Sequence, residues 1–385
     1  MRYSCIIFSH VIIVALLIGS SRAGAESIRV VPDEYVSLQS AIDNSNDGDT
    51  ILIRPGRYVG ESSLISNKNL KIKGDTSTGS KPILENLRTV LYTLRIEGSS
   101  QVTIEDVGFY GGNRAIELTE DGGYYPNLIA TRISTTQSLR GIFGEAESIV
   151  VQNSSFYQNE GSGVIITRFK DAKILNSSSS RNVYMGLFLR SSIPYASLLV
   201  QNVNLEFNKA DGLWIDQFDG IAELNDISIR ENQRRNLIVT KSRLIHAVDL
   251  SVGKYSSSSP SFGASGIRVE QSEVFFEDAY VSFNDGIGVH LLACESETPK
   301  MESYFLNSNF VVNRGGNWKS GTLSGCESGT WNWFNTGPSG EQIFSAGFEI
   351  DDENPNYNTC LESFGAPSAI CEAIQLNDEP TPPPW

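Results

Sequence analysis

Short strands of alternating apolar and polar residues recur through the middle of the chain, each preceded by an asparagine and a small residue. The repeating unit is Asn, three residues, a small or polar residue, and then an apolar-x-apolar strand. Five units follow this form: Asn159 to Gly163-VII, Asn182 to Gly186-LFL, Asn208 to Gly212-LWI, Asn232 to Asn236-LIV and Asn284 to Gly288-VHL. Such strands, separated by polar turns at intervals of roughly 20–30 residues, predict a β-solenoid rather than a sandwich.

The repeated asparagines are interpreted as structural. One coil cannot bury its inward side chains alone, so neighbouring coils stack about 4.8 Å apart and share a core. Asparagines at equivalent corners can form hydrogen-bonded ladders, and small residues suit tight corners that need left-handed backbone. A second polar position precedes each repeat anchor: Asp106, Thr131, Asn153, Asn176, Asn202, Asp226, Asp278 and Asn307.

The two ends of the chain depart from the repeat. Residues 35–44, YVSLQSAIDN, place Leu38, Ala41 and Ile42 on one helical face, which predicts a short helix capping the open end of the solenoid. The basic Arg2, an apolar run and a small-x-small end predict a signal peptide. The expected organisation is a signal peptide over 1–25, an N-terminal cap and first coil over 26–60, β-helix repeats over 61–315, and an irregular C-terminal cap with a Pro-rich tail over 316–385.

Composition narrows the classes of partner. The formal net charge of the 385 residues is −15, which excludes nucleic acid, because phosphate binding needs clustered Lys and Arg. Acidic polysaccharides would be repelled on average unless a local basic patch or a bound cation intervenes. After the signal peptide no stretch is long and apolar enough for a membrane span. The expected location is therefore secreted, either extracellular or, in a Gram-negative cell, periplasmic.

The four cysteines that follow the signal peptide lie in the last quarter of the chain, at Cys294, Cys326, Cys360 and Cys371. In an oxidising compartment they predict two disulfides, with three possible connectivities. We favour nearest-neighbour pairing, Cys294–Cys326 and Cys360–Cys371. A zinc site is disfavoured because no C-x-x-C pair is present. The C-terminal cap is thus expected to be disulfide-linked.

The stretch 35–61, followed by NLKIKGD and the Asn/Gly coils, resembles the pectin-lyase-like superfamily of right-handed parallel β-helices, over roughly residues 30–315. The resemblance implies an all-β, single-stranded right-handed parallel β-helix, built as a three-sheet prism whose first sheet often carries a substrate groove. The superfamily holds lyases, esterases, hydrolases, epimerases and catalytically silent proteins. Its N-T-D, G-H-G, D-P-H-D and G-x-x-D-F-I-F-G signatures are absent. Asp216 in the segment WIDQ resembles W-I-D-H of one pectate-lyase family, but Gln217 replaces the His.

If the apolar residues of each strand point inward, the residues between them form outward columns. The first predicted column is Glu117, Phe143, Ile165, Phe188, Trp214, Ile238, Arg268 and His290. The second is Thr119, Glu145, Thr167, Arg190, Asp216, Thr240, Glu270 and Leu292. Phe188 and Trp214 would lie on adjacent coils, and exposed aromatic residues of this kind indicate either binding or a covering segment.

Two interpretations of these columns stay open. In the first, the columns form a carbohydrate groove, with Phe188, Trp214 and Glu270 binding substrate. Aromatic rings stack on sugar faces, and guanidinium groups hold carboxylate or sulfate. The candidate catalytic residues are Asp216, Arg190, Arg268 and His290. In the second, the loop 257–265 or the C-terminal cap covers the aromatic residues, and Arg190 and Asp216 form a cross-strand ion pair.

The favoured function is a secreted β-helix that binds a polysaccharide or glycan along its first sheet and, in an enzymatic version, cleaves or epimerises it as a lyase or uronan epimerase. The alternative is a non-catalytic extracellular scaffold or adhesin. No cofactor motif is evident. The acidic turn at 351–354 offers oxygen ligands that Ca²⁺ could use, although it lacks the spaced loop of a dedicated calcium site.

Overall fold

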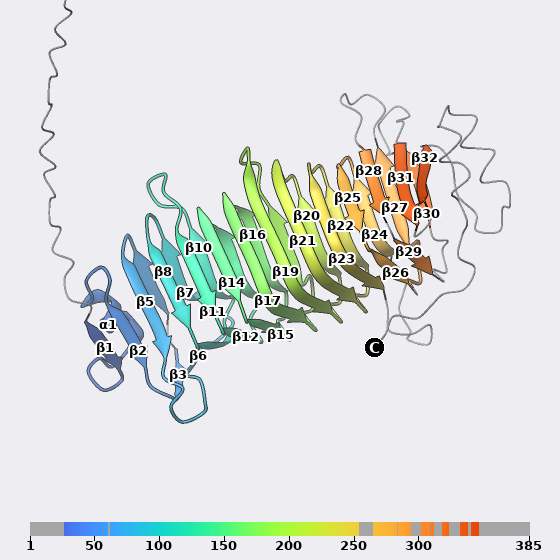
Figure 1. The fold of residues 1–385 in the computed structure, drawn as a ribbon. Helices are drawn as coiled ribbons and strands as arrows, with labels where there is room; N and C mark the ends of the chain where they lie inside the picture. Colours follow the sequence, from blue (N-terminus) through green and yellow to red (C-terminus); the bar gives the residue numbers. More distant parts are fainter. Residues whose placement is uncertain are drawn as a thin grey trace, which may run out of the picture.

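The computed structural model is an elongated stack of about ten coils of parallel strand, with one short helix among the residues it describes (Figure 1). It describes residues 27–60, 62–253, 265–282, 284–293, 302–306, 308–311, 318–322, 332–337 and 340–345. The predicted signal peptide, nearly all of the loop 257–265, the four cysteines, the turn at 351–354 and the Pro-rich tail lie outside these residues. The disulfide pairing therefore stays a prediction.

One face of the stack is an 11-stranded parallel sheet. Its strands, in spatial order, are β4 (Ser63–Ser66), β7 (Tyr92–Glu97), β10 (Arg114–Thr119), β13 (Arg140–Glu145), β16 (Ser162–Arg168), β18 (Leu187–Arg190), β20 (Asp211–Asp216), β22 (Arg235–Thr240), β24 (Ser265–Glu270), β27 (Val289–Ala293) and β30 (Trp318–Thr322). Each strand pairs in parallel with the strand one coil away, as in β18 with β20, so equivalent residues of successive coils lie side by side.

The other two faces belong to one 21-stranded sheet. The first of these faces contains β1 (Ile28–Val31), β2 (Thr50–Ile53), β5 (Asn69–Gly74), β8 (Gln101–Glu105), β11 (Asn127–Thr131), β14 (Ser148–Gln152), β25 (Val274–Glu277), β28 (Glu302–Leu306), β31 (Asn332–Gly337) and the antiparallel β32 (Gly340–Ser345). The second contains β3 (Arg57–Val59), β6 (Ile83–Asn86), β9 (Gly108–Gly111), β12 (Ser134–Thr136), β15 (Ser155–Tyr157), β26 (Tyr280–Ser282) and β29 (Asn309–Val311). Four long strands run through both faces: β17 (Asp171–Ser180), β19 (Ala196–Glu206), β21 (Gly220–Arg230) and β23 (Ile245–Gly253).

The three faces of the predicted prism are present, but two of them share one hydrogen-bonded sheet. The long strands turn the corner without ending because a single residue there takes a left-handed conformation, as Asn176 does at φ 48° and Asn202 at φ 52°. Asn and Asp tolerate this conformation better than other residues with a side chain. Most of the predicted second polar positions adopt it. In the coil of β11 and β12, Arg132 takes it at φ 52°, so the prediction of Thr131 was one residue early. Asn307 lies outside the described residues.

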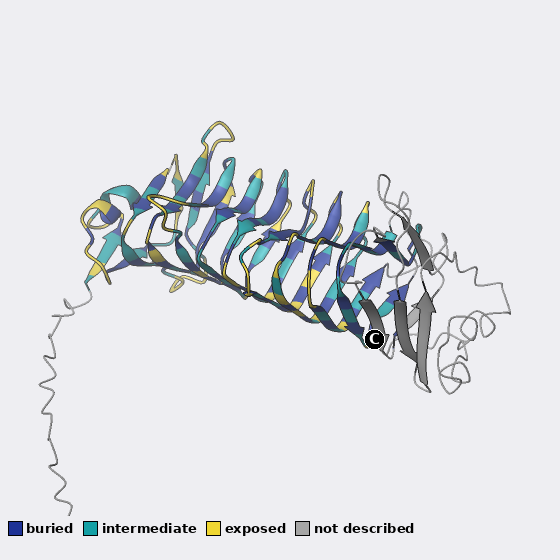
Figure 2. Cartoon of the chain, turned by 90° about the horizontal axis from the view of Figure 1, so that it is seen from above, coloured by how far each residue is buried: buried dark blue, intermediate teal, exposed yellow. Residues whose placement is uncertain are grey.

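The core runs unbroken along the inside of the stack (Figure 2). Strand residues alternate between core and surface as the sequence predicts; in β14, Ile149 and Val151 are 1% and 0% exposed. Phe169 and Phe218 stack inside it with ring centroids 5.7 Å apart and 25° between their planes. Because each coil shares this core with its neighbours, the position of every outward side chain is fixed by the coil beneath it.

The predicted asparagine ladder is present and fully buried. It joins Asn159, Asn182, Asn208, Asn232, Asn236 and Asn284. The backbone N–H of Asn208 donates to Oδ1 of Asn232 at 3.0 Å, and the same bond recurs one coil earlier. Asn236 then takes the next position: its Oδ1 accepts from Nδ2 of Asn232, and its Nδ2 donates to Oδ1 of Asn284, both at 2.9 Å. An asparagine at the small-residue position thus carries the ladder onward.

The repeat glycines serve close packing between coils and not left-handed backbone, which corrects the reason given for them above. Gly163, Gly186, Gly212 and Gly266 all have negative or extended φ. A Cβ on Gly212 would lie 2.7 Å from Nδ2 of Asn232 and 2.7 Å from the carbonyl oxygen of Asn236. Only glycine leaves room for the ladder at this corner.

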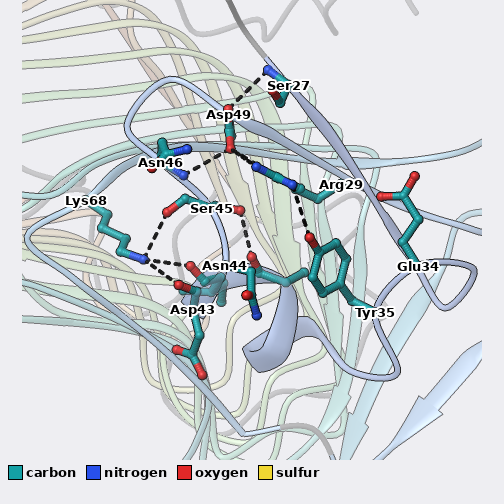
Figure 3. Close-up of polar contacts among 12 residues, drawn as sticks. Ser27, Arg29, Glu34, Tyr35, Asp43, Asn44, Ser45, Asn46, Asp49 and Lys68 are labelled. Atoms are coloured by element: carbon teal, nitrogen blue, oxygen red, sulfur yellow. Dashed lines mark hydrogen bonds and ion pairs between the residues drawn. The ribbon is translucent and has the colours of Figure 1, made fainter. Parts of the chain in front are cut away.

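The predicted helix is present as α1 (Leu38–Asp43), at the N-terminal end of the stack (Figure 1). Its apolar face, Leu38, Ala41 and Ile42, is buried in the core. The Lys68 ammonium donates to the carbonyl oxygens of Ile42 (2.8 Å), Asp43 (3.3 Å) and Ser45 (3.1 Å), which satisfies the C-terminal end of the helix (Figure 3). That α1 stabilises the fold by capping its open end remains a prediction.

Asp49 connects this end of the chain to the first coil (Figure 3). Its carboxylate accepts from the backbone N–H groups of Ser27 (3.1 Å) and Asn46 (3.0 Å) and from the Arg29 guanidinium (3.3 Å). Burial acts to raise the pKa of Asp49, but these donors outweigh it and the pKa is lowered.

Within the described residues, no helix is long and apolar enough to cross a membrane.

Candidate functional site

The first predicted column is confirmed, and it runs along the outward face of the 11-stranded sheet. Strand pairing places Phe188 beside Trp214, Trp214 beside Ile238, and Ile238 beside Arg268. The column also extends one coil before Glu117, to Arg95, and ends with His290 beside Lys319. Neighbouring members are about 4.8 Å apart, the spacing of hydrogen-bonded strands.

The second predicted column is confirmed only from Arg190 onward. Pairing joins Arg190 to Asp216, Asp216 to Thr240 and Thr240 to Glu270. Between β13 and β16 the register shifts after Gly144, so Glu145 pairs with Arg168 instead of Thr167. The prediction of Thr167 was therefore wrong. A one-residue bulge of this kind leaves no trace in a simple apolar-polar pattern.

The aromatic pair is real, but its two rings differ in exposure. Phe188 and Trp214 meet edge to face, with centroids 5.1 Å apart and 82° between their planes. Phe188 is 8% exposed because it packs against Met185 and Ala210, which lie at the start of its own coil and the next. Trp214 is half-buried and keeps part of its indole on the surface. The aromatic surface offered to a ligand is thus mainly that of Trp214.

A hydrogen-bonded chain of four side chains fixes this indole. Nε1 of Trp214 donates to Oγ1 of Thr240 at 2.9 Å, and that hydroxyl donates to Oδ1 of Asp216 at 2.6 Å. The other carboxylate oxygen, Oδ2, accepts from Nε of Arg190 at 2.7 Å and also from its Nη2. Asp216 is 5% exposed, whereas the Arg190 side chain is 39% exposed. The predicted ion pair is therefore present, and both oxygens of its carboxylate are occupied.

The remaining predicted residues form a separate group further along the sheet. Nε of Arg268 donates to Glu270 on the same strand, and both side chains are partly exposed. His290 lies beside Arg268 in the next coil. Ile238, only 1% exposed, separates Arg268 from Trp214 in the column. Arg190 and Asp216 are thus brought together with Trp214, and Arg268 with Glu270, but the two pairs do not form one constellation.

An arginine cluster at the other end of the sheet was missed by the sequence reasoning. Arg95 and Arg114 both donate to the buried carboxylate of Glu117, and Arg114 and Arg140 both lie over the ring of Phe143. Glu117 and Phe143 were in the predicted column, but Arg114 and Arg140 lie three residues before them, outside the apolar-x-apolar strand, and Arg95 lies in the column one coil before the predicted residues. The repeated Arg-x-Ile of β10 and β13 was the available signal.

Within the described residues, no group of three or more His, Cys, Asp or Glu side chains lies close enough to hold a metal ion. Glu117, Asp216 and Glu270 of this face are instead paired with arginines.

Comparison with known proteins agrees with the fold. The family model described as "right handed beta helix region" matches residues 92–243. A mutant of the periplasmic alginate epimerase AlgG superposes with a TM-score of 0.53 at 13% sequence identity, over 80% of this chain and 85% of that one. The A-module of Azotobacter vinelandii mannuronan C-5 epimerase AlgE6 has a TM-score of 0.41 at 12% identity, over 75% and 94%. The PL6 family alginate lyase AlyGC has a TM-score of 0.44 at 10% identity, over 94% and 60%. No curated protein matches the chain in sequence.

Proposed function

Because this chain is a right-handed parallel β-helix repeat protein with the pectin-lyase-like fold, we propose that it binds a polysaccharide along the outward face of its 11-stranded sheet. The observation that carries the proposal is the partly exposed indole of Trp214, held in place by Phe188 and by the chain of hydrogen bonds through Thr240 and Asp216 to Arg190. A ring fixed in this way can stack on a sugar face without losing further side-chain freedom on binding.

The arrangement supports binding more directly than catalysis. A general base must reach the proton that it removes, within about 2.6–3.2 Å. Asp216 is buried, and its two oxygens already accept from Thr240 and Arg190. Arg190 is the member of the pair with exposed surface, so it is the group that would meet a carboxylate or hydroxyl of the glycan. In this proposal Asp216 orients Arg190 and Trp214.

The enzymatic version makes a different prediction. A lyase or epimerase acting on a polyuronide would neutralise the uronate carboxylate and remove the α-proton, and a lyase would leave an unsaturated product that absorbs in the ultraviolet. Alginate is the first substrate to test, because the structural relative with the TM-score of 0.53 is named as an alginate epimerase. The assay is run with and without Ca²⁺, the one cofactor that we propose. If no polyuronide changes in absorbance or in epimer content, the protein is a binder or a scaffold.

Retention on immobilised glycans tests the binding proposal. Trp214→Ala is expected to weaken retention at least tenfold, because the variant lacks the aromatic ring on which the sugar would stack. Tyr157→Ala is the control, because Tyr157 is an exposed aromatic ring on the 21-stranded sheet. Circular dichroism and urea unfolding verify that both variants remain folded. Equal retention of the two variants would reject the groove and favour the scaffold or adhesin alternative.

We propose a secreted location, extracellular or periplasmic, on the basis of the predicted signal peptide over 1–25. The compatible observation is that the relative with the TM-score of 0.53 is named as periplasmic. N-terminal sequencing of the protein recovered from culture medium or periplasm, beginning near residue 26, is the expected result. Recovery of the full-length chain from the cytosol would contradict it.

A further inference from the structure

The arginine cluster on β7, β10 and β13 holds more positive charge than its surroundings neutralise. Arg95 and Arg114 share one carboxylate, that of Glu117, whose side chain is only 4% exposed. Nε of Arg95 donates to Oε2 of Glu117 at 2.7 Å, and Nη1 of Arg114 donates to Oε1. Arg140 pairs with no carboxylate among the described residues; its Nη1 donates to the amide oxygen of Asn113 at 3.4 Å. Three guanidinium groups therefore face a single acidic side chain.

Two of these guanidinium groups converge on the same aromatic ring. The central carbon of Arg114 lies 4.4 Å from the centroid of Phe143, and that of Arg140 lies 4.8 Å from it. Arg114 and Arg140 are also direct partners on adjacent strands, about 4.8 Å apart at their backbones. Like charges opposite one another on a sheet destabilise the fold, so Arg114 and Arg140, of which only Arg114 contacts the Glu117 carboxylate, cost stability unless an anion joins them.

The electrostatics of Arg114 point the same way. Burial, followed by the positive charges of Arg140 and Arg95, lowers the pKa of Arg114, although Glu117 is its hydrogen-bond partner. Its Nε is buried and has no hydrogen-bond partner within the described part of the chain. A buried guanidinium N–H without an acceptor is unusual, because nearly all buried polar groups are paired. Arg114 thus lacks a hydrogen-bond acceptor for its Nε within the described residues, and it lies among positive charges that Glu117 alone does not neutralise.

We propose that Arg114 and Arg140 form a subsite for an oxyanion carried by a glycan, either the carboxylate of a uronate or a sulfate ester. Both groups match the planar donor fork of a guanidinium, and either would bridge the two arginines across adjacent coils. The inference rests on the proposed function and deepens it, because it gives the glycan a charge. It also explains how a chain of net charge −15 can bind a polyanion. Salt screens the repulsion from distant acidic residues, whereas Arg114 and Arg140 attract the anion at short range.

The position of the subsite fits one extended ligand. Phe143 and Trp214 lie on the same outward column, three coils apart through Ile165 and Phe188, or about 14 Å at the strand spacing of 4.7–4.9 Å. A glycan lying along the solenoid axis would contact both. The anionic group would be held at β10 and β13, and a sugar face would rest on the indole of β20.

Three polymers with one backbone provide the test: dextran, carboxymethyl dextran and dextran sulfate. Arg140→Gln is the probe variant, because the loss of Arg140 breaks no ion pair with any residue that the structure describes and relieves repulsion within the cluster. Arg181→Gln is the control, since Arg181 also lies over aromatic rings, those of Tyr157 and Phe207, but at the corner that directly follows β17 of the 21-stranded sheet. Arg140→Gln is expected to weaken retention of at least one charged dextran tenfold or more, whereas Arg181→Gln changes it less than twofold. The polymer that loses retention identifies carboxylate or sulfate as the source.

A second measurement separates failure of this inference from failure of the proposed function. The thermal unfolding midpoint is compared in sodium sulfate and in sodium chloride of equal ionic strength, which requires no glycan. Wild type and Arg181→Gln should gain more from sulfate than Arg140→Gln does. Equal gains in all three proteins, or charged dextrans retained equally by all three, overturn the oxyanion subsite while leaving polysaccharide binding at Trp214 in place. If sulfate raises the unfolding midpoint less in Arg140→Gln than in the other two proteins, and no protein is retained on any glycan, the anion site is supported and the polysaccharide proposal is rejected.

Discussion

Asn208→Ala is expected to destabilise the protein by about 3 kcal/mol, because Asn208 lies in the middle of the buried ladder. Its Nδ2 donates to Oδ1 of Asn232 at 2.9 Å and to the carbonyl oxygen of Ser179 at 3.1 Å. Its Oδ1 accepts from the backbone N–H and from Nδ2 of Asn182, at 3.1 and 2.9 Å. Alanine removes all four bonds at a position that is 0% exposed.

The magnitude follows from what the substitution leaves behind. The Nδ2 group of Asn182 keeps two other acceptors, the carbonyl oxygen of Phe156 and Oγ of Ser179. The backbone N–H of Asn182 loses its acceptor and stays buried, which costs about 1–3 kcal/mol. Each lost hydrogen bond adds about 0.5–1.5 kcal/mol, partly offset by the smaller desolvation of alanine.

Urea unfolding followed by tryptophan fluorescence and circular dichroism measures this loss. Asn204→Ala is the matched control, four residues earlier on β19, because the Asn204 side chain is exposed, and it should shift stability by less than about 0.5 kcal/mol. A solenoid can unfold in parts, so hydrogen exchange at the amide of Asn182 provides a local readout. If both variants lose the same stability, or the amide of Asn182 stays protected in Asn208→Ala, the ladder does not hold the coils together.

Three further substitutions test other parts of the fold and site. Gly212→Ala should cost about 1–3 kcal/mol by urea unfolding, because its Cβ has no room against the next coil. Thr240→Val should cost about 1–2 kcal/mol and change the fluorescence of Trp214, since Asp216 and the indole both lose the bridging hydroxyl. Asp49 has a lowered pKa in the fold, so its contribution is present above about pH 5 and is lost as the pH falls through that lowered value. Asp49→Asn should therefore cost about 1–3 kcal/mol at neutral pH and progressively less as the pH falls through that lowered value, by unfolding at each pH.

The repeat determined most of the fold in advance. Asn159, Asn182 and Asn208 mark equivalent corners, and once these are aligned the outward residues follow by counting along each strand. That is why Phe188 and Trp214 could be placed side by side without a structure. The alignment fails where a coil carries an extra residue, as between Glu145 and Arg168, because a bulge shifts the register without changing the apolar pattern.

The candidate site was less predictable, because exposure depends on neighbours outside the strand. Phe188 occupies an outward position but is covered by Met185 and Ala210, from corners that the strand pattern ignores. Asp216 and Arg190 were placed together correctly. The hydrogen bonds through the Thr240 hydroxyl to Trp214 were not predicted, because they depend on the side-chain rotamers. Counting along strands gives adjacency, but it gives neither burial nor the direction of a hydrogen bond.

The two ends of the sheet face therefore have different chemistry, and that difference bears on function. At β18 and β20 the carboxylate of Asp216 is satisfied by Arg190 and Thr240, which leaves an aromatic surface and one partly exposed guanidinium. At β10 and β13, no carboxylate of the described residues pairs with Arg140, and none of their acceptors meets a buried N–H of Arg114. The net charge of the chain averages over both ends of the sheet, so it does not reveal the local positive charge at β10 and β13. A ligand that contacts both Trp214 and the arginine cluster must combine a sugar face with an oxyanion about 14 Å away. Charged glycans can meet this requirement, whereas neutral glycans lack the oxyanion.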